Sequence, residues 1–203
     1  MMTHRRYCFL PLVIFLLSFF FAGERRGSAQ QIGVKTNLLY LATTTPNLGI
    51  EFKLADRWTL GVEGSNNPFR FPQWMDDEGK VYNPKLIHWG VMPEAKYWFC
   101  GAYERSYLGV HGIYGEYNIG AIQFIRPLRE VRYQGIAFGG GLSYGYHWAI
   151  GGRWGLELSA GAGFIRFLYA KCDGYTCGGE IGRYQTNYFG PTKLALSLVY
   201  FIK

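Results

Sequence analysis

The sequence predicts an all-β protein, an eight-stranded antiparallel up-and-down transmembrane β-barrel. Composition is the first observation that favours this fold: 49% of the 203 residues are apolar, 18% are aromatic, only 17% are charged, and 28 are glycine. The mean hydropathy is nevertheless close to zero, at −0.04. Closely interleaved apolar and polar residues explain that value, and they are typical of barrels that face lipid on one side and a polar interior on the other.

Charge excludes one class of partner. The formal net charge of the chain is +7, but no run of five or more Lys and Arg residues occurs. Because the basic residues alternate with apolar ones, the sequence predicts no nucleic-acid surface.

The first 29 residues have the organisation of an export signal. Arg5 and Arg6 precede an apolar run at residues 9–22, which is shorter than the about 20 residues that a membrane-spanning helix needs. Small residues at 27–29 offer a cleavage site. We therefore expect a signal peptide at 1–29, a barrel domain at 30–203 and a place in a bacterial outer membrane. An uncleaved anchor is the alternative.

Period-two alternation is the second observation, and it divides the rest of the chain into eight strands. The clearest is the sixth, in which apolar residues from Ile136 to Trp148 alternate with small and polar ones. The apolar faces match the 9–11 tilted residues that cross the hydrocarbon layer. The predicted strands lie at 31–42, 47–54, from 58, about 85–99, about 106–118, about 133–148, from 154, and at the end of the chain.

Connection length is the third observation. The connections at 55–57, 100–105 and 149–153 are short, whereas those at 65–84, 119–132 and about 167–188 are long. On the side of the barrel that carries the long connections, only the first connection, at 43–46, is short. Short periplasmic turns and longer outer loops are the rule for outer-membrane barrels.

Aromatic side chains are expected in two places. The repeated Arg-Trp at the start of two strands suggests a girdle at the membrane interface, formed by Trp58, Trp98, Trp148 and Trp154. The long connections carry aromatics that could bind a partner or glycan, or pack locally over the rim: Phe69, Phe71, Trp74, Tyr82, Phe124 and Tyr175.

The cysteines suggest a local disulfide. Cys172 and Cys177 lie in a Gly-rich stretch, and an oxidising compartment would favour their pairing. No second pair exists to complete a metal site, so no metal is predicted. Cys100 is expected to be an unreactive residue that packs against its apolar neighbours.

Polar residues of the inner face could be catalytic or merely paired. His88, His111 and His147 point inward, and Ser143, Ser159, Glu94 and Glu157 are potential partners. A catalytic set needs hydrogen-bond contact among its members, which a sequence does not show. We expect instead that the charges pair inside the barrel, and therefore no enzyme and no cofactor; the paired set would be Lys35, Glu51, Lys53, Glu63, Glu94, Lys96 and Glu157.

Several segments resemble a known family. They are VKTNLLY at 34–40, TTTPNLGIEF at 43–52, RWTL at 57–60, PEAKYWFC at 93–100, YQG at 133–135, GLSYGY at 141–146 and NYFGPTK at 187–193. They resemble uncharacterised proteins of Bacteroides-type bacteria catalogued as domain of unknown function 3575. The resemblance implies an exported outer-membrane barrel, with fimbrial or other surface proteins as partners. It assigns no reaction. One departure is the final YFIK, since many such barrels end on an aromatic residue.

These observations predict a monomeric barrel in outer-membrane lipid that presents surface loops, with a role in surface assembly, adhesion or envelope integrity. A lipid-modifying or hydrolytic barrel enzyme and a soluble secreted β-sandwich are the alternatives. A pore is disfavoured because eight strands leave little lumen.

Overall fold

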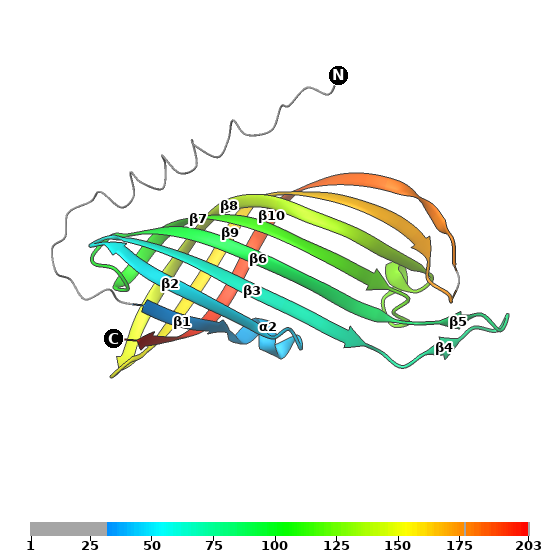
Figure 1. The fold of residues 1–203 in the computed structure, drawn as a ribbon, viewed down its shortest axis with the longest axis horizontal. Helices are drawn as coiled ribbons and strands as arrows, with labels where there is room; N and C mark the ends of the chain where they lie inside the picture. The colour runs from blue at the N-terminus through cyan, green and yellow to red at the C-terminus, as the bar shows by residue number, and fades with distance from the viewer. Residues whose placement is uncertain (1–31, 177, 203) are drawn as a thin grey trace, which may run out of the picture.

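The computed structural model describes residues 32–176 and 178–202. Eight long strands form one antiparallel sheet in the order β1, β10, β9, β8, β7, β6, β3, β2 (Figure 1). Because β1 pairs with both β2 and β10, the strand order closes into a barrel. The strands are β1 (Ile32–Asn37), β2 (Asn47–Ala55), β3 (Trp58–Arg70), β6 (Lys85–Trp98), β7 (Arg105–Gly120), β8 (Val131–Gly151), β9 (Trp154–Asp173) and β10 (Glu180–Ile202).

The predicted count of eight antiparallel strands is confirmed. The predicted signal peptide at 1–29 lies outside the described residues. None of the helices in the described part of the chain is long and apolar enough to span a membrane.

The predicted first strand is too long. It was expected to continue through residue 42, but β1 ends at Asn37 and the short helix α2 (Leu38–Ala42) follows. The side chain of Asn37 accepts a hydrogen bond from the Leu39 amide at 3.1 Å, which is the contact that starts a helix. Alternating apolar residues at 38 and 40 continued the strand pattern, so periodicity alone did not reveal this change.

The three predicted long connections are partly strand. β9 and β10 continue through most of the predicted loop at 167–188, so only residues 174–179 join them. In the other two, residues 71–84 carry a small hairpin of β4 (Trp74–Met75) and β5 (Val81–Tyr82), and residues 121–130 carry the short helix η1 (Arg126–Leu128). These connections lie at the end of the barrel opposite the start of β1 and the end of β10 (Figure 1); we call that far end the loop end.

The strands differ greatly in length. β1 has 6 residues and β2 has 9, whereas β8, β9 and β10 have 21, 20 and 23. The short pair therefore stops well before the loop end (Figure 1). The wall is closed around the terminal half of the barrel and incomplete around the loop half.

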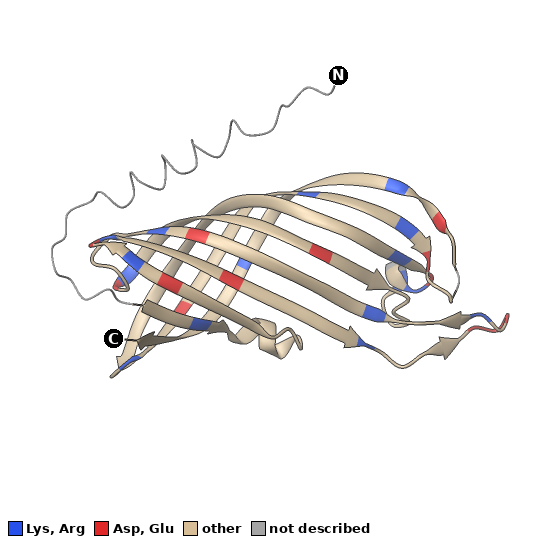
Figure 2. Cartoon of the chain, viewed as in Figure 1, with Lys and Arg blue, Asp and Glu red and all other residues tan. Residues whose placement is uncertain are grey.

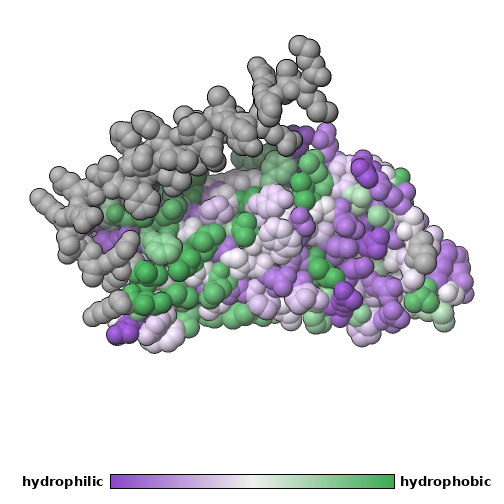
Figure 3. Space-filling view, in the orientation of Figure 1, coloured by the Kyte–Doolittle hydropathy of each residue, from purple (hydrophilic) through white to green (hydrophobic). Residues whose placement is uncertain are grey.

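Inner and outer faces follow the predicted alternation. On β9, Glu157 and Ser159 are buried, whereas Leu158 and Phe164 are exposed. On the visible face of the molecule, hydrophobic side chains gather over the terminal half and hydrophilic ones over the loop half (Figure 3). Charged residues lie at both ends, and others lie along the strands of the terminal half (Figure 2).

Candidate functional site

The interior of the terminal half holds six buried charges, which we call the ionic cluster. Three lysines and three glutamates form it, and each side chain is at most 4% exposed. They come from five strands, with Glu94 and Lys96 both on β6, and each stands at an inward position of its strand. The members are Lys35, Glu51, Glu94, Lys96, Glu157 and Lys193.

Lys96 lies at the centre of the ionic cluster. Its Nζ donates to Glu51 Oε2 at 2.8 Å and to both carboxylate oxygens of Glu157 at 2.8 Å. Lys193 Nζ donates to both oxygens of Glu94 at 2.6 Å. Lys35 Nζ is 3.4 Å from Glu51 Oε2. Since removing a buried charge from water is costly unless it is paired, this arrangement is what allows six charges to stay inside.

Neutral side chains complete the hydrogen bonding of the carboxylates. Thr59 donates to Glu51 at 2.6 Å, Tyr107 donates to Glu157 at 2.8 Å, and Ser143 donates to Glu94 at 2.6 Å. The predicted pairing of interior charges is thus observed for five of the seven expected residues. Of the other two, Lys53 is 4.0 Å from exposed Asp56, and no ion pair of Glu63 is seen among the described residues.

Lys193 was not among the predicted interior charges, because the last strand was expected to start its alternation at Leu194. In the structure β10 begins at Glu180, and Lys193 continues the inward series of Ala195 and Ser197. A register shift between Pro191 and Lys193 inserts one residue just before it. The sequence signal that could have revealed Lys193 is the position of a basic residue just before a long alternating strand.

Aromatic rings close the terminal end of the interior beneath the ionic cluster. Trp98, Tyr103 and Tyr107 pack together, with Phe201 against them. Trp98 is fully buried and its Nε1 donates to Thr59 at 2.9 Å. The prediction that Trp98 belongs to the interface girdle is therefore wrong. Tyr97 and Trp98 are consecutive in a strand and must point to opposite faces.

The other three girdle tryptophans do lie on the outer face. Trp58, Trp148 and Trp154 are each about half exposed, and each packs against an outward tyrosine. The ring centroids of Trp58 and Tyr97 are 5.2 Å apart, and those of Trp154 and Tyr200 are 4.8 Å apart. All three tryptophans stand beside short turns of the terminal end, and their place at a membrane interface stays a prediction.

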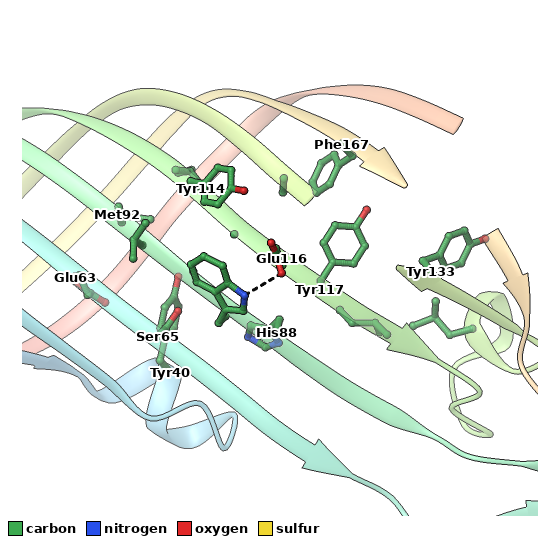
Figure 4. A pocket seen from close by; sticks show the side chains of 18 residues that line it. Tyr40, Glu63, Ser65, His88, Met92, Tyr114, Glu116, Tyr117, Tyr133 and Phe167 are labelled. Carbon is green, nitrogen blue, oxygen red and sulfur yellow. Dashed lines mark hydrogen bonds between the residues drawn. The ribbon is translucent and has the colours of Figure 1, made fainter. Parts of the chain in front are cut away.

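A cavity of about 510 Å³ occupies the loop half above the ionic cluster (Figure 4). We call it the upper cavity. Apart from Glu116, its wall from β7, β8, β9 and η1 is apolar and aromatic; that wall includes Ile113, Tyr117, Ile119, Leu128, Tyr133, Ala137 and Phe167. Gly90 and Gly115, which face each other on β6 and β7, leave their part of the wall without side chains.

Polar groups line the upper cavity from several elements. Tyr40 of α2, Glu63 and Ser65 of β3 and His88 of β6 lie on one side, and Glu116 of β7, which accepts a hydrogen bond from Trp89 Nε1 at 3.3 Å, lines the cavity as well (Figure 4). His88 Nδ1 is buried and has no hydrogen-bond partner among the described residues. In the described chain no hydrogen bond joins His88 to Ser65 or Glu63, so a nucleophile and base pair is not assembled.

The predicted inward orientation of all three histidines is observed, but the histidines are dispersed. His111 Nε2 is 2.9 Å from Thr192 Oγ1, and His147 Nδ1 is 2.5 Å from the Tyr103 carbonyl. Ser143 lies in a Gly-x-Ser-x-Gly sequence at 141–145, which in hydrolases marks a strand-to-helix turn. Here the segment lies within β8.

The six loop aromatics fall into two groups. Phe71 makes edge contacts with Phe69 and Phe124, at centroid distances of 4.7 and 5.6 Å. Trp74 stacks on Tyr82 at 4.1 Å, and Tyr175 completes this second group at 6.4 Å from Tyr82. Trp74 Nε1 also donates to the Ala121 carbonyl at 2.8 Å. The second group is therefore local packing, whereas Phe124 of the first stays largely exposed.

Cys172 is a buried free cysteine, and Cys100 is an exposed free one. The free thiol of Cys172 corrects the predicted disulfide; Cys177 lies outside the described residues. Within the described ranges no group of three or more His, Cys, Asp or Glu residues could hold a metal ion.

In a comparison with protein-family models, residues 12–202 match a family described as "Protein of unknown function (DUF3575)". No curated protein matches the chain.

Proposed function

Since the chain belongs to the DUF3575 family, whose description names no activity, we propose its function from the geometry: it is a small barrel that spans a bacterial outer membrane and presents its loop end at the cell surface, without catalysis. The observation that carries the proposal is the contrast between an apolar outer belt and a charged interior. In a soluble barrel the charges would lie outside and the apolar residues inside.

The outer belt has the height of a hydrocarbon layer. On β9 the outward residues from Trp154 to Phe164 are apolar, and the next outward residue is Arg166. The ten residue steps between Trp154 and Phe164 rise about 25 Å, at about 3.3 Å per residue and a tilt of about 40°. The apolar band of membrane barrels is about 25 Å tall.

Outward apolar side chains recur around the wall at the level of this belt. They are exposed on neighbouring strands, which on a soluble protein of this size would be an unusually large patch. Examples are Leu48, Leu60, Val62, Leu108, Val110, Leu142, Leu158, Phe164, Phe189 and Leu194.

A role as a pore is not favoured. The ionic cluster and the aromatic floor fill the terminal half, with Trp98 and Tyr107 fully buried. A structural or surface-assembly role, with fimbrial or other surface proteins as partners, agrees with this plugged interior. The exposed ring of Phe124 on the loop end is the best candidate for contact with such a partner.

Two measurements on the full chain test the proposal. Membrane fractionation should place the protein in the outer membrane and resistant to carbonate extraction, and its mobility in an SDS gel should change on boiling. A protein that fractionates with the periplasm and whose mobility ignores boiling would instead support the secreted sandwich.

A further inference from the structure

Glu63 of β3 is a buried carboxylate that the described chain does not pair. It stands at an inward position and is 8% exposed. Each of the three glutamates of the ionic cluster lies within 4.0 Å of a lysine, whereas no hydrogen bond or ion pair of the Glu63 side chain is found among the described residues. Because a buried carboxylate without a cation is costly, Glu63 is a candidate for contact with a cation from outside the chain.

The lysines of the ionic cluster do not serve Glu63. Strand pairing places Lys35 beside Gly49, and Gly49 lies opposite Glu63. The Lys35 ammonium is nevertheless directed to the three glutamates of the ionic cluster, at distances of 3.4, 3.9 and 4.0 Å. Since the ionic cluster contains three lysines and three glutamates, its charges balance, and the charge of Glu63 is additional.

Glu63 borders the upper cavity, whose lining carries negative charge only (Figure 4). Glu116 is the second carboxylate there, but it is exposed and accepts a hydrogen bond from Trp89 Nε1. Among the described residues that line the cavity there is no Lys or Arg. A concave site lined by charge of one sign concentrates ions of the opposite sign, so this cavity favours a cation.

Two hydrogen-bond acceptors accompany Glu63 on the same side of the cavity. Ser65 follows it on the inner face of β3 and lies opposite Gly90 of β6. His88, two residues from Gly90, has a buried Nδ1 without a hydrogen-bond partner in the described chain. Because Gly90 has no side chain, the space between Ser65 and His88 stays open. A carboxylate, a hydroxyl and a neutral imidazole nitrogen can all accept from an ammonium group, which has three N–H donors.

The opposite wall suits an apolar body. Tyr117 of β7 and Phe167 of β9 meet edge to face there, with ring centroids 6.0 Å apart, and Ile113 lies on the same wall (Figure 4). Aromatic rings add an attraction for cations to their apolar area. The cavity therefore combines an acidic, hydrogen-bonding side with an aromatic side.

The gap in the wall gives this cavity a polar border. β10 pairs with β1 only from Ser197 onward, and the pairing of β3 with β2 ends at Ser65. Above α2, therefore, both strands have unpaired edges within the described chain. The residues along these edges are exposed and mostly polar, as a route from water requires; they include Asn66, Arg70, Arg183, Gln185 and Asn187.

We propose that the upper cavity binds a small organic ammonium ion, whose charged group is held by Glu63, Ser65 and His88 and whose apolar body packs against Tyr117 and Phe167. The volume of about 510 Å³ falls within the range of small-molecule sites, about 300–1,000 Å³. The proposal does not depend on the membrane location, since the ligand comes from water at the loop end.

Three indole compounds of similar size test the requirement for positive charge. Tryptamine carries an ammonium group, tryptophol a neutral hydroxyl, and indole-3-acetate a carboxylate. Equilibrium dialysis at neutral pH with the full chain in a nonionic detergent measures the Kd of each compound, after subtraction of binding to empty micelles. Tryptamine should bind about tenfold to a hundredfold more tightly than tryptophol, as expected for a hydrogen-bonded charge, and indole-3-acetate should bind most weakly.

Matched carboxylate variants locate the charge that matters. Glu63→Gln keeps the size of the side chain and should weaken tryptamine binding about tenfold to a hundredfold, while tryptophol binding stays unchanged. Glu116→Gln is the control: its carboxylate is exposed, so tryptamine binding should change less than about threefold. Circular dichroism checks the fold of both variants.

A cavity-filling variant supplies a second test should Glu63→Gln not fold. A Cβ on Gly90 would be 3.4 Å from the nearest atom, so the side chain of Gly90→Leu enters the cavity at ordinary contact distance. Tryptamine and tryptophol should then both bind at least about tenfold more weakly.

The outcomes decide the proposal without reference to the membrane. Equal binding of tryptamine and tryptophol by the wild-type chain, or tryptamine binding that neither Glu63→Gln nor Gly90→Leu reduces, overturns the ammonium site. Equal losses in Glu63→Gln and Glu116→Gln overturn the role of Glu63. Fractionation and gel mobility test the membrane location separately.

Discussion

Lys96 and Glu157 form a bidentate ion pair inside the barrel: the ammonium of Lys96 donates to both carboxylate oxygens at 2.8 Å, and neither side chain is more than 2% exposed. The pair links β6 to β9, which lie on different sides of the ring and are not adjacent in the sheet. It therefore ties together parts of the wall that share no backbone hydrogen bonds.

Replacing Lys96 with Met should destabilise the barrel strongly. The substitution leaves Glu157 buried without its principal cation, and breaking a buried pair by removing one partner costs about 3–5 kcal/mol. Unfolding in urea, followed by the loss of the folded band in an unboiled gel, measures the change in the free energy of unfolding.

Two further variants identify the cause of that loss. Lys53→Met removes a charge that is partly exposed and 4.0 Å from its partner Asp56, so its effect should stay below about 1 kcal/mol. Lys96→Met combined with Glu157→Gln should recover part of the stability, because no uncompensated charge remains on Glu157. If the double variant loses as much free energy of unfolding as Lys96→Met and Glu157→Gln lose when added together, the two residues act independently.

The charged interior could be predicted because alternation assigns each residue to one face. Lys35, Glu51 and Lys96 occur at alternating positions among apolar neighbours, and the closed sheet brings them together. Their individual partners could not be predicted. Which lysine meets which glutamate depends on the stagger between strands, and one partner, Lys193, lies before the stretch of β10 in which the alternation was recognised.

A charge on the outer belt should reveal the surrounding solvent. Leu158 lies on the outer face of β9 midway along the belt, and Arg at the bilayer midplane of a barrel costs about 2–4 kcal/mol. Leu158→Arg should therefore lower the free energy of unfolding in vesicles by about that amount. Ile150→Arg, beside the turn between β8 and β9, is the control, because near the interface an Arg costs only about 0–1 kcal/mol. Equal effects at both positions would argue against a membrane-spanning belt.

Close approach of Tyr107 to Gly145 makes a second structural prediction. A Cβ on Gly145 would overlap the ring of Tyr107, which donates a hydrogen bond to Glu157 at 2.8 Å. Gly145→Ala should therefore destabilise the barrel by about 1–3 kcal/mol through overpacking. Gly64→Ala is the matched control, since its Cβ would meet nothing closer than 4.0 Å. The midpoints of urea unfolding compare the two, and a Gly145→Ala midpoint equal to that of Gly64→Ala would contradict the prediction.

The loop half was harder to predict than the terminal half for a physical reason. Alternation appears in a sequence only where one face of a strand meets an apolar solvent or core. Beyond Phe164 and Phe189 both faces of β9 and β10 carry mixed residues, so these strands resembled a loop. The upper cavity depends on two such features, the extension of β10 and the early end of β1 at Asn37.

Asp76 organises the β4–β5 hairpin at the loop end and should make it sensitive to acid. Its carboxylate accepts hydrogen bonds from the amides of Glu78 and Lys80 at 3.0 and 2.8 Å and from the Tyr82 hydroxyl at 3.2 Å. Desolvation acts to raise the pKa of Asp76. The hydrogen bonds from Lys80, Tyr82 and Glu78 outweigh it, and they lower the pKa below its ordinary value.

The pKa of Asp76 is lowered in the folded hairpin. The ionised carboxylate therefore stabilises the hairpin fully above the ordinary Asp pKa of about 4, and this stabilisation is lost as the pH falls through the lowered pKa of the folded state. Hydrogen exchange at Lys80 should therefore stay slow from neutral pH to about pH 4 and accelerate, beyond its intrinsic pH dependence, in stronger acid. Asp76→Asn should exchange faster at neutral pH and lose the acid transition. Exposed Asp77, for which the structure shows no such contacts, provides the control Asp77→Asn. An acid transition that persists in Asp76→Asn would assign it to another group.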